Sequence, residues 1–276
     1  MNIMKKFHVK KKSGEIEEFN PKKMFRSLIH AGASSEYANE IISKVSSDAY
    51  DGIPTSIIFK NAFKLLQKKD KATAMKFTLK DAVYRLGPTG YPFENFIAEL
   101  FKYKGYSVKK GYVLKGKCVM HEVDVVAEKE NEKIMIECKF HSKPWMTSGI
   151  QTALYCYARF LDLNDGLKSN KFTELTLVSS TKFSRDVRKY SKCKGINVLG
   201  WGYPRKSGLS DMIERKKLYP VTIIESMDNH TISKLLNNDY VLLKDFVNAD
   251  LKQMHRLTGI SETKLKKYQD EGHLIV

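Results

Sequence analysis

Cysteines and long apolar runs are scarce in this sequence of 276 residues. The four cysteines lie far apart and lack the CxxC or Cys/His spacing of a zinc site, so we expect no structural zinc. No apolar run approaches the ~20 residues that a membrane-spanning helix needs, and the N-terminus lacks the apolar core of a signal peptide. The sequence therefore predicts a cytoplasmic protein with reduced thiols and no membrane segment.

Acidic residues are also in the minority. Lysine and arginine number 48 against 31 aspartates and glutamates, which gives a net charge of +17 and a pI near 9.5. This excess favours a polyanionic partner: nucleic acid first, a nucleotide second and an anionic membrane third. Residues 226–276 carry none of the excess, because they hold seven basic and seven acidic side chains. The length suits two or three domains of roughly 100–150 residues each.

Charged residues interrupt two apolar, β-branched runs between Met120 and Phe140, which a short polar turn separates. This pattern predicts a β-hairpin. Asp124 lies in the first run, and Glu137 and Lys139 lie two residues apart in the second. Side chains at i and i+2 share a face of a strand, so Glu137 and Lys139 should point the same way and Asp124 can join them. Burying such charges is costly unless they have a function.

The N-terminal part has a basic turn followed by helical patterns. Residues 6–19 predict a small hairpin, and Asn20-Pro21 predicts a helix start with asparagine as the N-cap. Further helices are expected from Ser35, after Pro54, and as one continuous helix from about Lys71 to Leu86. Gly87-Pro88 then predicts a domain boundary.

Residues 5–86 resemble the ATP-cone domain, the nucleotide-sensing module of ribonucleotide reductases and their repressor. The likeness lies in the segment from Val9 to Gly14 and in Glu17-x-Phe19-Asn20, although the family usually has Lys-Arg-Asp-Gly where this chain has Lys-Lys-Ser-Gly. The resemblance implies ATP or dATP as a regulatory ligand, and a basic turn beside a helix N-terminus suits a triphosphate. A merely solvated lysine turn is the alternative. The expected nucleotide-binding residues are Val9, Lys10, Lys11, Lys12, Phe19 and Lys23.

The central part alternates helices and strands, which predicts a layered α/β domain. Its sequence resembles the Mrr-like restriction endonucleases of the PD-(D/E)xK nuclease superfamily. The motif is Asp124 followed by Glu137-Cys138-Lys139, with Glu94 on a preceding helix and Gln151 at the start of the next helix; Val123 stands where many members have proline. The resemblance implies a mixed sheet flanked by helices, DNA as substrate and the catalytic set Glu94, Asp124, Glu137, Lys139 and Gln151.

Phosphodiester hydrolysis explains these residue types. A hard cation such as Mg²⁺, or Mn²⁺, polarises the phosphate and activates water, and it prefers carboxylate oxygens. Asp124 and Glu137 are the expected ligands, with the Cys138 backbone carbonyl as a third by resemblance. Lys139 should orient the attacking water, and Glu94 should order a metal-bound water or a second ion. An ordinary surface salt bridge and a non-cleaving, DNA-binding nuclease fold are the alternatives.

Several weaker candidates surround this motif. His121 is expected on the opposite strand face and His141 on the same cleft, while Tyr155, Tyr157 and Phe160 are expected in the core. Trp145, beside Lys143, either touches DNA or packs on the core. A basic stretch with helical spacing is either a solvated face or a phosphate track. The candidate DNA contacts are Lys109, Lys110, Lys143, Arg185, Arg188 and Lys189.

From about Ser226 the pattern is wholly helical, and it is similar to a helix-hairpin-helix module around Leu257 to Ser261. Such hairpins can offer backbone N–H groups to DNA phosphate, but a packing or dimerisation role is open as well. The whole predicts an ATP-cone domain over 1–88, an Mrr-like nuclease domain over 89–225 and a helical domain over 226–276. We expect a Mg²⁺-dependent DNA endonuclease of restriction or defence type, a homodimer because two strands must be cut. The alternative is a nucleotide-responsive DNA-binding regulator.

Overall fold

The computed structural model describes residues 6–276 and divides into two compact units. One unit holds the described residues up to Lys80 together with residues 273–275, and the other holds residues 81–272 and 276. None of the helices in the described part is long and apolar enough to cross a membrane.

The first unit is mainly helical around a three-stranded sheet. β1 (His8–Lys10) pairs antiparallel with β2 (Ile16–Glu18) and parallel with β3 (Ile53–Pro54), which confirms the predicted N-terminal hairpin. Leu28, Ile41 and Leu66 are buried in its core. The helices are α1 (Pro21–His30), α2 (Ser35–Ser47), α3 (Thr55–Lys69), α4 (Lys71–Phe77) and α5 (Leu79–Tyr84), the last crossing the unit boundary.

The predicted extent of one helix was wrong. The segment expected to be one helix from Lys71 to Leu86 breaks at Thr78 into α4 and α5. The Thr78 hydroxyl donates to the Met75 carbonyl at 2.8 Å, and the Thr78 N–H bonds to the same carbonyl. Because this side chain offers the backbone a tighter local bond, the regular i to i−4 ladder stops there.

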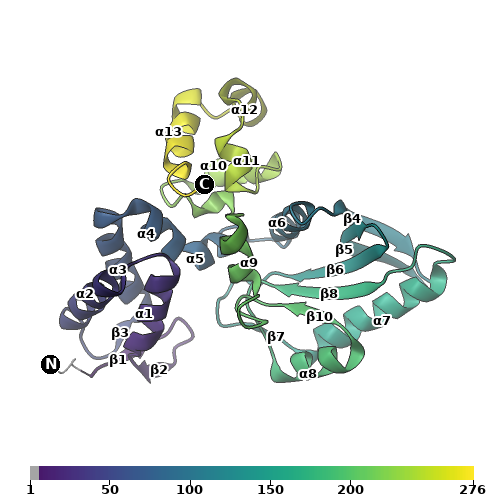
Figure 1. The fold of residues 1–276 in the computed structure, drawn as a ribbon, viewed down its shortest axis with the longest axis horizontal. Helices are drawn as coiled ribbons and strands as arrows, with labels where there is room; N and C mark the ends of the chain where they lie inside the picture. Colours follow the sequence, from purple (N-terminus) through teal and green to yellow (C-terminus); the bar gives the residue numbers. More distant parts are fainter. Residues whose placement is uncertain (1–5) are drawn as a thin grey trace. The chain divides into compact units, whose positions relative to one another are not determined.

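The second unit contains a five-stranded mixed sheet with the order β10-β8-β6-β5-β4. β4, β5 and β6 pair antiparallel, whereas β6, β8 and β10 pair parallel through helical crossovers. Helices α7 and α8 cover one face of this sheet and α6 lies on the other (Figure 1). The elements are α6 (Tyr91–Lys102), β4 (Ser107–Lys115), β5 (Met120–Lys129), β6 (Glu132–Lys139), β7 (Thr147–Ser148), α7 (Ile150–Gly166), β8 (Glu174–Ser179), β9 (Lys182–Phe183), α8 (Arg185–Lys194) and β10 (Asn197–Leu199). This layered α/β arrangement confirms the predicted fold class.

The end of the chain is all helical, as predicted. Hydrogen bonds from side chains to backbone carbonyls join it to the start of the same unit. Arg85 donates to the carbonyls of Thr222, Ile224 and Met227, and the Thr222 hydroxyl donates to the Ala82 carbonyl. The elements are α9 (Leu209–Lys216), the 3₁₀ turn η1 (Val221–Ile223), α10 (Asn229–Asn237), α11 (Leu243–Val247), α12 (Leu251–Thr258) and α13 (Glu262–Gly272). The turn between α12 and α13 contains Gly259 with a φ of 69°, which ends α12 in the left-handed region.

Candidate active site

The site begins where the hairpin of β5 and β6 opens. The register pairs Val125 with Ile136, so its continuation by one residue brings Asp124 opposite Glu137. The strand is distorted at this point. Val123 and Val126 both pack into the core under α7, which breaks the alternation of faces at Asp124, and Gly111 on the neighbouring β4 has a φ of 53°. Asp124 Oδ2 accepts a hydrogen bond of 2.7 Å from the Cys138 N–H, so the carboxylate is held against the backbone of β6.

Glu137 is a buried acid between two cations. Its exposed fraction is 2 %, and it lies on the α7 face, two residues after the core residue Met135. Lys139 Nζ is 2.9 Å from Oε1, which agrees with the predicted sharing of a face, and Arg159 Nη1 is 2.7 Å from Oε2. Hydrogen bonds to both oxygens therefore fix the plane of the carboxylate.

Sequence reasoning missed Arg159. It comes from α7, is 8 % exposed, and sits among the buried helix positions Ala153, Cys156 and Leu163. An arginine on the apolar stripe of a helix was the available signal, because such a charge needs a buried partner.

Glu94 reaches the same neighbourhood from the first turn of α6. Burial, followed by the charges of Asp124 and Glu137, raises the pKa of Glu94 to about 7. Burial and the Glu137 charge likewise raise the pKa of Asp124 to about 6. Burial alone would lower the pKa of Lys139, but the charge and hydrogen bond of Glu137 outweigh it and raise that pKa. Three carboxyl groups thus crowd one end of the sheet, and two of them resist losing their protons.

The donor chemistry fits a hard divalent cation. Asp124, Glu137 and Glu94 offer carboxylate oxygens, and a divalent charge would relieve the repulsion that raises the pKa values of Glu94 and Asp124. Over residues 6–276, however, no three histidine, cysteine, aspartate or glutamate side chains stand ready-made around a common metal position. Both oxygens of Glu137 are held by Lys139 and Arg159 instead. These contacts do not test the Cys138 carbonyl, so its role as a ligand stays a prediction.

Gln151 and Tyr155 lie on α7, about two turns and one turn before Arg159, respectively. Gln151 is exposed in the first turn, and the structure gives it no hydrogen bond to the three carboxylates. The prediction that Tyr155 belongs to the core was wrong: its side chain is 62 % exposed, with its ring 5.4 Å from the Arg159 guanidinium carbon. Positions four residues apart are neighbours along a helix, so Tyr155 lies one turn before Arg159 and covers the solvent end of the charged pair without being buried itself. Tyr157 and Phe160 do pack against the core, as predicted.

His121 and His141 form side-chain hydrogen bonds with groups other than Glu94, Asp124 and Glu137. His121 Nε2 is 2.8 Å from Asp162 of α7, whose carboxylate also caps the loop before β5 through the Cys118 N–H. His141 Nε2 is 2.9 Å from the Ser148 hydroxyl, which lies 3.3 Å from the Ser179 hydroxyl. Burial and the nearby Lys139 charge lower the pKa of His141.

The predicted DNA-binding residues fall into two groups. Lys109, Lys143, Arg185 and Lys189 are exposed, as is Arg188, whose guanidinium lies 5.4 Å from the Tyr203 ring. Lys110 instead forms an ion pair of 3.0 Å with Asp239, which ties β4 to the turn after α10. Trp145 is 46 % exposed in the loop before α7, so it does not pack in the core.

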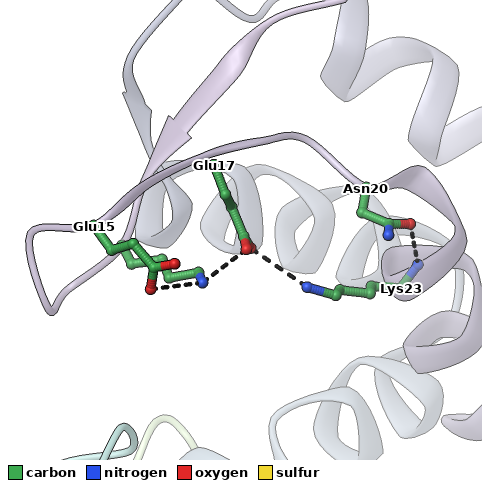
Figure 2. A network of polar contacts seen from close by, with 5 residues as sticks. Glu15, Glu17, Asn20 and Lys23 are labelled. Atoms are coloured by element: carbon green, nitrogen blue, oxygen red, sulfur yellow. Dashed lines mark hydrogen bonds and ion pairs between the residues drawn. The ribbon is translucent and has the colours of Figure 1, made fainter.

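The N-terminal basic turn is internally paired. Glu17 lies between two lysine ammonium groups, because its carboxylate is 2.7 Å from Lys11 Nζ and 3.5 Å from Lys23 Nζ. Figure 2 shows Glu17 and Lys23 pointing toward each other. Lys11 also reaches Glu15 at 3.0 Å, and Asn20 caps α1 by accepting from the Lys23 N–H. The hydrogen bond from Lys11 lowers the pKa of Glu17.

Two predicted nucleotide-binding side chains face inward. Val9 is buried, and the Phe19 ring stacks on Phe7 at 4.8 Å between centroids. Lys10 and Lys12 are exposed. Any nucleotide contact by Val9 must therefore come from its backbone, and the exposed lysines remain the open positions of the turn.

Comparison with known proteins divides the chain into three matched regions. Family models match an ATP cone domain over residues 7–80, a restriction endonuclease domain over 88–200 and an AF1548-like C-terminal domain over 219–276. The suspected ATP-cone and Mrr-like architecture is confirmed by these matches, and the central sheet has the fold expected of a PD-(D/E)xK-like nuclease domain.

Two relatives each align with about two thirds of this chain. An uncharacterized protein of Archaeoglobus fulgidus is 37 % identical over 180 residues, which are 65 % of this chain and 99 % of the relative. The crystal structure of AF1548, a protein of unknown function, is 36 % identical with a TM-score of 0.60, and covers 67 % of this chain and 97 % of that one.

Proposed function

The chain belongs to the same protein family as the Archaeoglobus fulgidus protein, and we propose that it is a Mg²⁺-dependent (or Mn²⁺-dependent) endodeoxyribonuclease. The observation that carries this proposal is the meeting of Asp124, Glu137 and Glu94 at the open end of one hairpin, with Lys139 2.9 Å from Glu137. Carboxylates that repel one another lower stability, but they can bind a cation, and the lysine beside them can bind a phosphate.

Each residue then has a role in phosphodiester hydrolysis. A bound Mg²⁺ would supply charge to the phosphate and lower the pKa of a water. Asp124 and Glu137 would hold the cation together with the Cys138 carbonyl, and Glu94 would order a further water or a second ion. Lys139 orients the attacking water and stabilises the charge that develops on the phosphate. Gln151, from the start of α7, hydrogen-bonds into the site once substrate is present.

The flanking parts supply substrate and regulation. The exposed basic residues Lys109, Lys143, Arg185, Arg188 and Lys189 follow the DNA backbone. ATP or dATP binds the N-terminal basic turn through Lys10, Lys11, Lys12 and Lys23 and changes the cleavage rate. We further propose domains over 1–88, 89–225 and 226–276, a homodimer that cuts both strands, a cytoplasmic location and a role in restriction or defence, the last from the likeness to restriction endonucleases alone.

A plasmid cleavage assay tests this proposal. Purified protein is incubated with supercoiled DNA and Mg²⁺ or Mn²⁺, with and without ATP or dATP, and Asp124→Ala and Lys139→Ala are compared with wild type. Nicking that needs the metal and is lost in both variants supports the nuclease. The exposed Lys68→Ala, far from the hairpin in sequence, is the matched control. Absence of nicking under every condition, or nicking that persists in both variants, overturns it.

A second candidate is a nucleotide-responsive DNA-binding regulator that does not cleave. It is favoured by one observation, the complete pairing of Glu137 with Lys139 and Arg159, which leaves no ready-made metal cluster among the described residues. Metal-independent DNA binding that responds to nucleotide, without nicking, would establish the regulator.

A further inference from the structure

The pairing of Glu137 with Arg159 is unusual for a residue that a cation must reach. Glu137 is 2 % exposed and Arg159 8 % exposed, and their contact of 2.7 Å links β6 to α7. Taking two such charges out of water costs several kcal/mol, and a buried ion pair repays this only when its geometry is good. The neighbours of Arg159 on its helix, Cys156 and Leu163, are apolar and fully buried. An apolar side chain at position 159 would therefore serve packing as well, and the arginine calls for a functional reason.

The two cations on Glu137 are not equivalent. Lys139 comes from the same strand, and its side chain is 33 % exposed, so it can turn toward a phosphate in solvent. The Arg159 side chain is 9 % exposed and is enclosed by the helix and the sheet. Its guanidinium is also stacked near the Tyr155 ring, which stands at the solvent side of the pair. Arg159 is thus the fixed counter-ion of Glu137.

A divalent cation bound by Asp124 and Glu137 must compete with this fixed counter-ion. Metal ions take carboxylate oxygens, and the oxygen that Arg159 occupies is one of only two on Glu137. Resting on the nuclease proposed above, we propose that Arg159 is a positioning residue that holds the Glu137 carboxylate in the metal-free site and shares or yields it when the cation binds. Arg159 thereby weakens metal binding and orients Glu137 for turnover.

Direct metal binding tests this without relying on cleavage. Mn²⁺ is titrated into wild type, Arg159→Gln, Arg159→Lys and the exposed control Arg205→Gln, and free Mn²⁺ is followed by electron paramagnetic resonance. Removing the guanidinium charge next to the ligand should tighten Mn²⁺ binding by about 10-fold in Arg159→Gln. The same variant should cleave more slowly than wild type at saturating metal, because Glu137 loses its orientation. Arg205→Gln should bind Mn²⁺ like wild type.

Arg159→Lys keeps the charge but loses the planar fork, so it should fold even if Arg159→Gln does not, and it should bind Mn²⁺ about 2- to 3-fold more tightly. Mn²⁺ binding by Arg159→Gln alone would also support the proposal. If wild type binds Mn²⁺ and the folded Arg159 variants bind it equally or more weakly, the role of Arg159 is wrong while the nuclease stands. If neither wild type nor any variant binds Mn²⁺ or cleaves DNA, both proposals fail.

Discussion

The two charged regions of this protein are built on opposite principles. In the N-terminal turn the charges alternate in sign: Glu17 lies between Lys11 and Lys23, and the hydrogen bond from Lys11 lowers the pKa of Glu17 (Figure 2). Where the pairing of β5 with β6 stops, beside the end of β6, carboxylates are gathered, and the pKa values of Glu94 and Asp124 rise to about 7 and about 6. The charges of the first arrangement balance one another without a ligand, whereas the carboxylates of the second repel one another, and a bound cation would relieve this repulsion.

This contrast shows which charged cluster is the better functional candidate. Opposite charges in water pair readily and contribute little, so the exposed lysines of the turn say little about a ligand. Carboxylates held together in a half-buried site cost stability, and proteins tolerate that cost mainly at functional positions. Variants of the two regions test whether they also differ in their effects on cleavage, stability and ligand binding.

Removing Asp124 should have the largest effect. Asp124→Ala should lower the rate of plasmid nicking by about 100-fold or more, because the proposed site loses one of the two carboxylates that would hold the cation. Lys11→Ala should leave unchanged the rate measured without nucleotide. The measurement is the initial rate of nicking in Mg²⁺ at constant salt. Equal losses in both variants would show that the two regions do not differ in function.

Glu137→Gln should have the next largest effect, on stability. It leaves the buried Arg159 without its partner, and breaking a buried pair in this way costs about 3 kcal/mol. Glu99→Gln, which removes the partner of the exposed Lys102, should cost less than about 1 kcal/mol, because the cation left behind stays in solvent. Denaturant unfolding in the presence of a chelator measures both. A cost for Glu137→Gln as small as that for Glu99→Gln would mean that the buried pair contributes nothing.

The strained site should also give the metal-free protein a pH dependence. The folded-state pKa of Glu94 is raised from its ordinary value of 4.5 to about 7, so between these values the folded state holds a proton that the unfolded state has lost. Stability should therefore fall as pH rises through this window, and Asp124 should add to the fall below about pH 6. Thermal unfolding from pH 5 to 8 in a chelator checks this.

Two controls separate the site from the rest of the chain. Glu94→Gln should flatten the slope of stability against pH. In the wild-type protein, Mg²⁺ should restore at pH 8 the stability that is lost as the pH rises. A slope that is the same in Glu94→Gln and wild type would assign it to other groups.

Local patterns predicted the parts of this site that lie close in sequence. The hairpin, the shared face of Glu137 and Lys139 and the helix carrying Glu94 all followed from strand and helix periodicity. Arg159 did not, because its contact with Glu137 joins a helix to a strand 22 residues away and depends on how α7 packs. The exposure of Tyr155 was missed for the same reason, since the rotation of α7 on the sheet decides which of its aromatic residues face the core.

The pairing in the N-terminal turn was missed for a different reason. The lysine run suggested an open phosphate site, but the register of β1 with β2 carries Glu17 back toward Lys11. The lysine run alone does not show that Glu17 lies beside Lys11 across the hairpin, so it overstates the free positive charge of the turn.

The smallest effect is expected from Glu17→Gln, and it sharpens the comparison most. Because the three charges are exposed and solvated, the change should leave thermal stability nearly unchanged. It should release Lys11 and Lys23 for a triphosphate and tighten ATP or dATP binding a few-fold, measured by calorimetry at low salt, where surface charges are least screened. Lys64→Gln, an exposed change on α3, is the control. Weaker nucleotide binding by Glu17→Gln would mean that Glu17 orients the lysines for the phosphate, and the N-terminal pairing would then be part of a site instead of a competitor for it.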